Sequence, residues 1–278
     1  MKEAVIITGA TGLLGSSLAL KFWDKGFDLL ITSKNKKKLE LIKKNLPKKD
    51  QTCELFAADL SCENSLSALT NKIKGSELNY SVLINNAATH GPIGKTWEID
   101  LKEWRQSLEV NLLAPLELCR TIIPMMIKRE SGTIINISGG GASASRANFS
   151  SYACSKTSLV RLTETLAKET EGTGITVNSI APGMMNSSLL KELIALDPKI
   201  TGEEEFSKAK DVVENPSNEN LEQTIDLILF LISGEGRVIS GKFISSIWDN
   251  WSEWTLNFKR IMDSDLYTLR RVTTTDKT

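Results

Sequence analysis

The two residues best suited to proton transfer are Tyr152 and Lys156, which stand four positions apart. We expect the segment Ser151–Glu169 to be a helix, and this spacing would place the phenol and the ammonium group on one face. A neighbouring ammonium group stabilises a phenolate, so we expect Lys156 to lower the pKa of Tyr152. Such a tyrosine can donate or accept a proton near neutral pH. The same spacing of Tyr and Lys is common in helices that have no catalytic role. The pair therefore indicates catalysis only together with the other motifs of the sequence.

A second chemical motif is the glycine-rich segment 8–15, Thr-Gly-Ala-Thr-Gly-Leu-Leu-Gly, between an expected strand and an expected helix. Gly9 permits a tight turn, Gly12 lets the backbone approach a phosphate, and Gly15 lets the helix pack closely on the strand. The free N–H groups and the dipole of the helix favour an anion at its start. The segment therefore predicts a binding site for a dinucleotide pyrophosphate.

The end of the second expected strand, at residues 29–35, indicates which dinucleotide binds. No Asp or Glu is present there to accept a hydrogen bond from a ribose 2′-hydroxyl. Ser33 and Lys34 are suited instead to a 2′-phosphate, which basic residues commonly hold. We therefore predict NADP in preference to NAD, with NAD still possible. In the alternative interpretation, Lys34 only begins the solvated lysine-rich run at 34–49.

Short apolar, β-branched runs that alternate with longer segments of helical period must position these residues. The expected strands are Ala4–Ile7, Leu29–Ile31, Cys53–Ala57, Val82–Ile84, Thr133–Ile137, Thr176–Ile180 and Lys242–Ile247. Continuously apolar strands are typical of parallel sheets that helices cover on both faces. The alternation predicts an α/β fold: one doubly wound parallel β-sheet flanked by helices on both faces.

Composition excludes several classes of function. The chain of 278 residues has 34 lysines and arginines against 34 aspartates and glutamates, so we expect no nucleic-acid partner. It has no apolar run of about 18 residues, so we expect no membrane span. Four scattered cysteines and a single histidine predict free thiols and no metal site. Free thiols are typical of the cytoplasm, where we expect the protein to lie.

Taken in order, the motifs resemble those of the short-chain dehydrogenase/reductase family over roughly Ala4 to Ile244. Besides the glycine turn and the Tyr152–Lys156 pair, the resemblance is carried by Asp59-Leu60, Asn85-Asn86-Ala87-Ala88, Asn111, and Val177-Asn178-Ser179-Ile180-Ala181-Pro182-Gly183. This ordered and properly spaced set is highly specific. The fold that the resemblance implies is a Rossmann-type sheet.

The resemblance implies a role for each matched residue. Tyr152 would be the general acid/base that protonates a carbonyl oxygen as hydride leaves the nicotinamide, and Lys156 would hold the nicotinamide ribose. The backbone carbonyl of Asn111 would hold a water that leads to the lysine. The cofactor would contact Gly9, Thr11, Gly12, Leu14, Ser33, Lys34, Asp59, Leu60, Asn86, Ala87, Tyr152, Lys156, Pro182 and Gly183. Among these, Asp59 would bind the adenine amino group, and Pro182 and Gly183 would pass the nicotinamide face.

Pro115 gives the Asn111 role a physical context. Pro115 stands four residues after Asn111 and lacks the N–H that would bond the Asn111 carbonyl in a helix. We hypothesise that this keeps the carbonyl free. In the alternative, the proline only kinks a helix.

The sequence departs from the family pattern in two places. The glycine spacing is that of the extended, sugar-nucleotide-modifying branch, whereas Asn85–Ala88 and the modest length fit the short branch. The family's catalytic serine stands thirteen positions before the tyrosine, which is Gly139 here. Ser138 is one position away, and on a strand that shift reverses the side-chain direction. The glycines at 139–141 could let Ser138 reach the substrate; otherwise Ser143, Ser145 or no serine would serve.

We therefore predict an NADP-preferring oxidoreductase that interconverts a carbonyl and a secondary alcohol, with Asn111, Ser138, Tyr152 and Lys156 as catalytic residues. Its partners would be a small-molecule substrate and further copies of itself, in the homodimer or homotetramer usual for the family. One alternative is a sugar-nucleotide epimerase or dehydratase. Another is a catalytically weakened nucleotide-binding regulatory or scaffold protein. The lone histidine, His90, follows the Asn-Asn-Ala-Ala motif and is more typical of an incidental loop residue than of a catalytic one.

The chain divides into a Rossmann-fold domain at 1–247, with a substrate loop region at 184–218, and a C-terminal extension at 248–278. Apolar residues recur around the start of the extension at spacings of four, three, four and three. These are Ile247, Trp251, Trp254, Phe258 and Ile261. The spacing predicts a helix with one apolar face. That face would pack either on the chain's own core or across a dimer.

Overall fold

The computed structural model describes residues 2–273, and its strands pair into one sheet. All seven strands run parallel in the order β3-β2-β1-β4-β5-β6-β7. Their bounds are β1 Glu3–Thr8, β2 Asp28–Ser33, β3 Cys53–Ala57, β4 Asn79–Asn85, β5 Gly132–Ile137, β6 Ile175–Ala181 and β7 Phe243–Ser245. The seven strands expected from the sequence are therefore present, and the last is shorter than expected.

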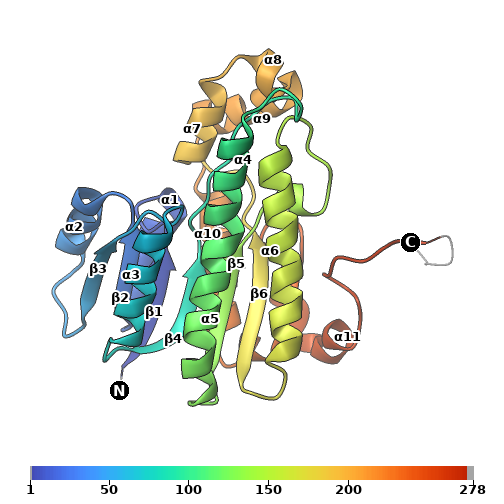
Figure 1. Cartoon of the computed structure of the whole chain (residues 1–278). Helices are drawn as coiled ribbons and strands as arrows, with labels where there is room; N and C mark the ends of the chain where they lie inside the picture. The colour runs from blue at the N-terminus through green and yellow to red at the C-terminus, as the bar shows by residue number, and fades with distance from the viewer. Residues whose placement is uncertain (1, 274–278) are drawn as a thin grey trace.

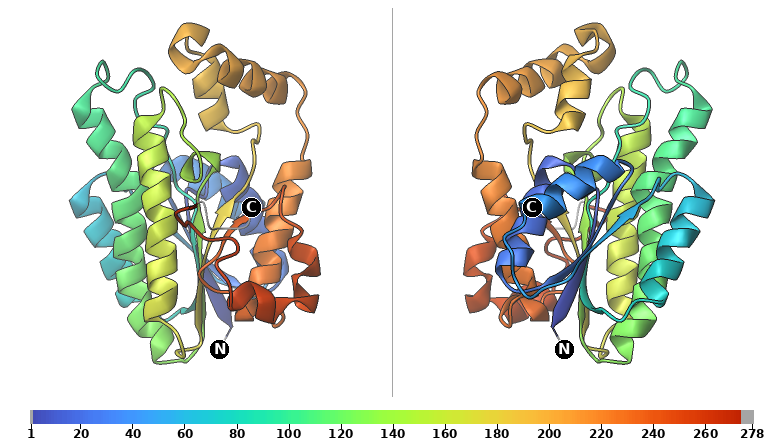
Figure 2. Two further views of the ribbon diagram at one scale, coloured as in Figure 1. Left: turned by 90° about the vertical axis from the view of Figure 1, so that its right-hand side faces the viewer. Right: turned by 90° about the vertical axis from the view of Figure 1, so that its left-hand side faces the viewer.

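Helices cover both faces of the sheet (Figures 1 and 2). One face carries α1 Leu13–Asp24, α2 Lys36–Asn45 and α10 Glu219–Ile232. The other carries α3 Glu63–Lys74, α4 Leu101–Leu108, the π-helical turn η1 Glu109–Leu113, α5 Ala114–Ile127 and α6 Ser150–Glu169. The doubly wound parallel sheet of Rossmann type is thereby confirmed.

The alternation of side chains along β1 explains why its residues Ala4–Ile7 are all apolar. Val5 and Ile7 are buried against the face that carries α1 and α10, and Ala4 and Ile6 are buried against the face that carries α3 and α5. Successive side chains of a strand point to opposite faces, and both faces are covered here. The position of β1 between β2 and β4 marks the point where the order of connection reverses. Ligands of such sheets bind outside the carboxyl ends of the strands at this point.

Short elements gather beyond those carboxyl ends. They are η2 Gly140–Ala142, α7 Ser188–Ile194, α8 Pro198–Thr201 and α9 Glu203–Glu214. Figure 1 shows α7, α8 and α9 together at the top of the molecule, above the sheet. The polar segment 184–218, expected from the sequence to cover the substrate, supplies these three helices.

The helical run Leu101–Ile127 is long and apolar enough to cross a membrane, judged by length and composition among the described residues. Leu118, Ile122 and Met126 of this run are buried in the cluster that α3, α5 and the sheet form. A mostly apolar helix packed in this way is a core helix of a layered fold. The run is interrupted by the π turn η1, directly before Pro115 at the start of α5.

The C-terminal extension differs from the expected helix. It contains a 3₁₀ segment, η4 Trp251–Leu256, and a short helix, α11 Phe258–Met262, with a break at Asn257. The expectation of one continuous helix was wrong because two short pieces, each turned separately toward the core, bury the apolar residues. Trp254 and Ile261 join the cluster that α10 and the sheet form. Of the two alternatives, the stripe packs on the chain's own core. Residues 274–278 of the extension lie outside the described part of the chain.

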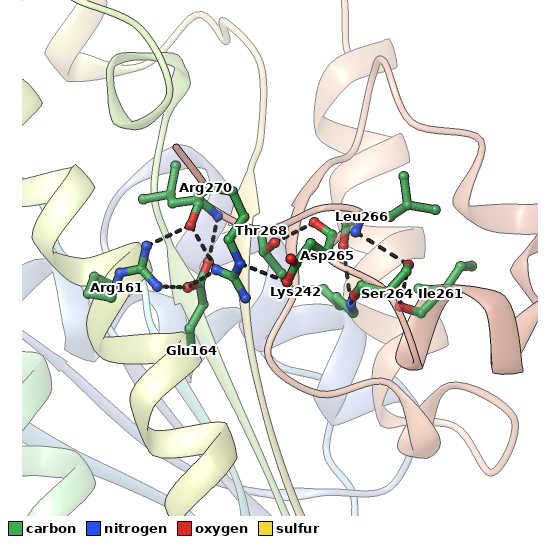
Figure 3. Close-up of polar contacts among 10 residues, drawn as sticks. Arg161, Glu164, Lys242, Ile261, Ser264, Asp265, Leu266, Thr268 and Arg270 are labelled. Carbon is green, nitrogen blue, oxygen red and sulfur yellow. Dashed lines mark hydrogen bonds and ion pairs between the residues drawn. The ribbon is translucent and has the colours of Figure 1, made fainter. Parts of the chain in front are cut away.

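The extension also binds the β7 edge of the sheet (Figure 3). In the chain, β7 follows the 3₁₀ turn η3 Gly236–Val238. The Lys242 ammonium donates to the carbonyl oxygens of Ser264, at 2.9 Å, and Leu266, at 3.1 Å. The Phe243 N–H donates to the Tyr267 carbonyl at 2.7 Å. Unpaired edge N–H groups invite pairing with another chain, so this contact protects the edge.

Candidate active site

A cleft of about 960 Å³ opens at the carboxyl ends of the central strands, beneath α7 and α9. Its lining includes most of the site residues expected from the sequence: Gly9, Thr11, Gly12, Leu14, Ser33, Lys34, Leu60, Asn86, Ala87, Ser138, Tyr152, Lys156, Pro182 and Gly183. Asp59 and Asn111 are not part of the lining, but they contact residues beside it. The structure therefore brings segments far apart in the sequence to one cleft, from the glycine turn to the tyrosine–lysine pair.

The glycine turn between β1 and α1 has a geometry that requires glycine. Gly9 has φ +62°, and a Cβ atom there would lie 2.8 Å from the Ala87 Cα. A Cβ atom on Gly15 would lie 2.4 Å from the Gly9 carbonyl oxygen, which shows how closely α1 packs on the turn. No side chain caps the start of α1 at Gly12. The first N–H groups of α1 are thus free of a side-chain cap and can meet an anion in the cleft.

Asn86 fastens this turn to the end of β4. Its side-chain amide donates to the carbonyl oxygens of Thr8, at 2.9 Å, and Gly9, at 3.1 Å. The Thr8 hydroxyl in turn accepts the N–H groups of Asn86 and Ala87, each at 3.0 Å. These bonds fix the glycine turn against the neighbouring strand.

Lys34, which lines the cleft, forms an ion pair of 3.2 Å with Asp59. Burial acts to raise the pKa of Asp59, but hydrogen bonds from Ser61 and the charge of Lys34 outweigh it and hold that pKa below its usual value. The pair leaves Lys34 beside Ser33, where the sequence predicts a 2′-phosphate site. Lys38, which the sequence did not indicate, also lines the cleft.

Lys156 is 1 % exposed and donates from Nζ to the Ile137 carbonyl oxygen at 2.7 Å. Burial lowers the pKa of Lys156 to about 7. Burial also raises the pKa of Tyr152, and the positive charge that acts against this rise is that of Arg146. The Tyr152 pKa is therefore raised and not lowered as expected, because burial of the phenol outweighs the opposing positive charge.

Asn111 lies in the π turn η1, is fully buried, and ties that turn to two other elements. Its side-chain amide donates to the Thr89 carbonyl oxygen at 2.9 Å and to Ser155 Oγ at 3.0 Å. Its side-chain oxygen accepts the Thr89 N–H at 3.0 Å. Asn111 thereby positions α6, and with it Tyr152, against the loop that follows β4.

The end of β5 offers Tyr152 no serine hydroxyl. Ser138 is 2 % exposed, and its Oγ donates to the Lys156 carbonyl oxygen at 3.3 Å. Gly139 has extended backbone, and a Cβ atom on it would lie only 2.7 Å from the Tyr152 hydroxyl oxygen. The space for a side chain at position 139 is thus taken by Tyr152. Of the other serines considered, Ser145 lines the cleft and is exposed, and Ser143 bonds the Gly140 carbonyl.

Two further residues stand beside Tyr152 that the sequence did not indicate. The Arg146 guanidinium lies 3.9 Å above the Phe149 ring and 5.7 Å from the Tyr152 ring centre. Arg146 also pairs with Glu205 of α9 at 2.7 Å, which ties the segment above the cleft to the start of α6. His90 contacts the Tyr152 ring edge to face, with ring centres 5.2 Å apart. Both come from loops, where no periodicity reveals which side chains will meet.

The family model of short chain dehydrogenases matches residues 3–196 of the chain. The chain therefore belongs to the short-chain dehydrogenase family of oxidoreductases.

Two curated relatives illustrate this membership. The chain is 27 % identical over 244 residues to the uncharacterized oxidoreductase YxbG of Bacillus subtilis, covering 88 % of this chain and 89 % of that one. It is 33 % identical over 194 residues to the 3-oxoacyl-[acyl-carrier-protein] reductase FabG of Rickettsia typhi, covering 68 % and 75 %.

Solved structures share the fold at lower identity. YwfH, an NADPH-dependent reductase involved in bacilysin biosynthesis, superposes with a TM-score of 0.77 at 23 % identity over 90 % of this chain and all of that one. The L-sorbose reductase of Gluconobacter frateurii, complexed with NADPH and L-sorbose, gives 0.74 at 22 % identity over 88 % and 94 %.

Proposed function

We propose that the chain is an NADP-preferring oxidoreductase that interconverts a carbonyl and a secondary alcohol of a small molecule. The observation that carries the proposal is the continuity of the cleft between the start of α1 and the Tyr152–Lys156 pair. An anion site at one end and a proton donor at the other are what a reduced dinucleotide and a carbonyl require.

The residues of the cleft fit this cofactor. The glycine turn, which has no room for a Cβ atom at Gly9, would hold the pyrophosphate against the start of α1. Ser33 and Lys34 would hold the 2′-phosphate, and Lys156 would hold the nicotinamide ribose. Bound there, the nicotinamide supplies a hydride to a carbonyl carbon or takes one from an alcohol carbon.

Tyr152 would transfer the proton. Burial raises its pKa, so at neutral pH its hydroxyl keeps the proton that a developing alkoxide needs. Asn111 would act by positioning, because its three hydrogen bonds hold α6 and the loop after β4 in place.

The preference for NADP rests on Ser33, Lys34 and the lack of an acidic residue at the end of β2. Several related proteins are NADPH-dependent by their names, among them the pterin aldehyde reductase of Arabidopsis thaliana. A structural neighbour, 4-hydroxyisoleucine dehydrogenase, is complexed with NADH, so NAD is the competing cofactor. Titration of the protein with NADPH and NADH, read by nicotinamide fluorescence, compares the two dissociation constants directly.

A weakened nucleotide-binding protein is the second candidate, favoured by Gly139 at the position of the family's serine. Assays of NADPH consumption with a β-keto ester, an aldehyde and a keto sugar separate the two. If the protein is an oxidoreductase, it should reduce at least one of these three classes of carbonyl compound, and Tyr152→Phe should abolish that turnover. Tight NADPH binding without turnover in any class would favour the second candidate.

Two broader properties belong to the proposal. The family habit supports a homodimer or homotetramer, and the four scattered cysteines support a reducing compartment such as the cytoplasm. Sedimentation of the purified protein measures its mass in solution. The extension at 248–278 is proposed to be an addition to the dinucleotide-binding domain at 1–247 that stabilises its sheet edge.

A further inference from the structure

His90, the chain's single histidine, lies in the loop after β4 and packs against the start of α6. Its side chain is 8 % exposed, lines the cleft, and packs edge to face on the rings of Tyr152 and Phe149. Its backbone carbonyl accepts a hydrogen bond from Ser151 Oγ at 3.0 Å. The ring is therefore held in one place, in contact with the proton donor of the proposed reaction.

The surroundings of the imidazole define its protonation. Burial, together with the positive charges of Arg146 and Lys156, lowers the pKa of His90 to about 4. The ring is consequently neutral near pH 7 and carries one N–H group.

Nδ1 of His90 is enclosed and has no hydrogen-bond partner among residues 2–273. A buried N–H without a partner is costly and rare in folded proteins. The proton is therefore on Nε2. The small exposed part of the ring faces the cleft that His90 lines. His90 is thus a neutral donor that no group in the described part of the chain uses.

At the end of β5, the proposed reaction lacks a second hydrogen-bond donor to the substrate. A carbonyl that accepts hydride develops negative charge on its oxygen, and a second hydrogen bond beside that of the proton donor stabilises it. Gly139 has no side chain, and the Ser138 hydroxyl is bonded to the Lys156 carbonyl. In this arrangement neither residue gives this hydrogen bond.

We propose that His90 is a catalytic residue whose Nε2–H group donates a hydrogen bond to the carbonyl oxygen of the substrate, next to the Tyr152 hydroxyl. The inference rests on the proposed oxidoreductase function. In reduction, a hydride from the nicotinamide forms the new C–H bond and brings both electrons. The Tyr152 proton forms the new O–H bond, and a proton from solvent returns to the phenolate. His90 keeps its proton throughout.

Two variants test this role with the full-length protein and the carbonyl compound of the panel that it reduces fastest. His90→Phe keeps an aromatic ring between Phe149 and Tyr152 but removes the donor. Its kcat should fall by about 100-fold, the usual loss for one donor to a developing oxyanion. The dissociation constant for NADPH and the melting temperature should stay close to those of the unmodified protein. His90→Gln places an amide N–H near the position of Nε2 and should recover most of the lost kcat.

The outcomes separate this inference from the proposed function. If His90→Phe keeps kcat within twofold, His90 has no catalytic role, although the oxidoreductase stands. If both variants lose kcat and melting temperature alike, His90 is only structural and the inference is wrong. If the unmodified protein binds NADPH but reduces no carbonyl of the panel, the proposed function fails first and the role of His90 fails with it.

Discussion

The Tyr152 hydroxyl lies where a side chain on Gly139 would begin, since a Cβ atom at position 139 would be 2.7 Å from it. Because the Gly139 backbone is extended, the glycine is needed here for space and not for conformation. The Tyr152 hydroxyl therefore occupies the space of a side chain at the position where the family carries a serine. A hydrogen-bond donor for the substrate must come from elsewhere, and His90 is placed to provide it.

Gly139→Ser tests this packing. A serine Cβ would force the Tyr152 hydroxyl to move, and a displacement of about 1 Å in a catalytic group can lower the rate about 100-fold. We expect kcat to fall at least tenfold while NADPH binding is unchanged. If the site were merely missing its serine, the same substitution would raise kcat, and that result would contradict the packing argument.

Lys34→Ala tests the cofactor preference. A hydrogen bond to a charged group contributes about 1.5–3 kcal/mol, so the variant should bind NADPH about 10- to 100-fold more weakly and NADH nearly as before. Lys2→Ala is the matched control, since Lys2 also forms an exposed ion pair, with Asp50 at 3.1 Å. Equal dissociation constants for NADPH and NADH in the unmodified protein would contradict the preference.

Lys156→Met tests the buried lysine through the pH dependence of stability. The Lys156 pKa is about 7 in the folded protein and 10.5 in a solvated lysine. Between these values the unfolded chain binds more protons, so the free energy of unfolding of the unmodified protein gains up to about 1.4 kcal/mol per pH unit as pH rises. Lys156→Met lacks this gain. We expect the variant to be the more stable at pH 6 and its advantage to shrink toward pH 10.

The comparison with Lys156→Met uses the difference between the two proteins at each pH, measured by urea unfolding. Burial raises the pKa of the Cys53 thiol to about 11 and that of Cys119 to about 12, so both thiols act in the opposite direction above pH 9. These thiols are common to both proteins and cancel. A difference that does not change with pH would show that Lys156 is charged in the folded state.

Trp254→Ala tests the packing of the C-terminal extension. Trp254 is 4 % exposed, packs in the main cluster, and contacts Tyr267 with the rings tilted by 40° and their centres 4.4 Å apart. Truncation of a buried tryptophan costs about 3–5 kcal/mol of unfolding free energy. Trp248→Ala is the control because Trp248 is 86 % exposed, and it should change stability by no more than about 0.5 kcal/mol. Equal effects would place the extension outside the cooperative core.

The sequence predicts the sheet well because the middle of most strands is a short run of apolar residues, and this pattern depends on burial between two helical layers. It also predicts which residues line the cleft, since the glycine turn and the ends of β4 and β6 follow directly from strands whose positions are clear. The structure of the C-terminal extension was harder to predict, because apolar residues at spacings of three and four fit one helix and two short helical turns equally well. Only the folded chain shows the break at Asn257.

The chemistry around Tyr152 was less predictable for a related reason. His90, Arg146 and Glu205 belong to three separate segments, and only the folded chain places them near one another. The pKa values of Tyr152 and Lys156 depend on burial, which the i, i+4 spacing does not report. The direction of the Ser138 side chain likewise depends on the carbonyl that α6 presents to it.

The central claim, that Tyr152 supplies the proton in an NADPH-dependent carbonyl reduction, is tested most directly by the turnover of Tyr152→Phe. This variant keeps the ring that packs against His90 and removes only the hydroxyl group. We predict that kcat falls by about 10²–10⁴ on the carbonyl compound that the unmodified protein reduces fastest, with the dissociation constant for NADPH nearly unchanged. Full turnover by Tyr152→Phe on that compound would contradict the account.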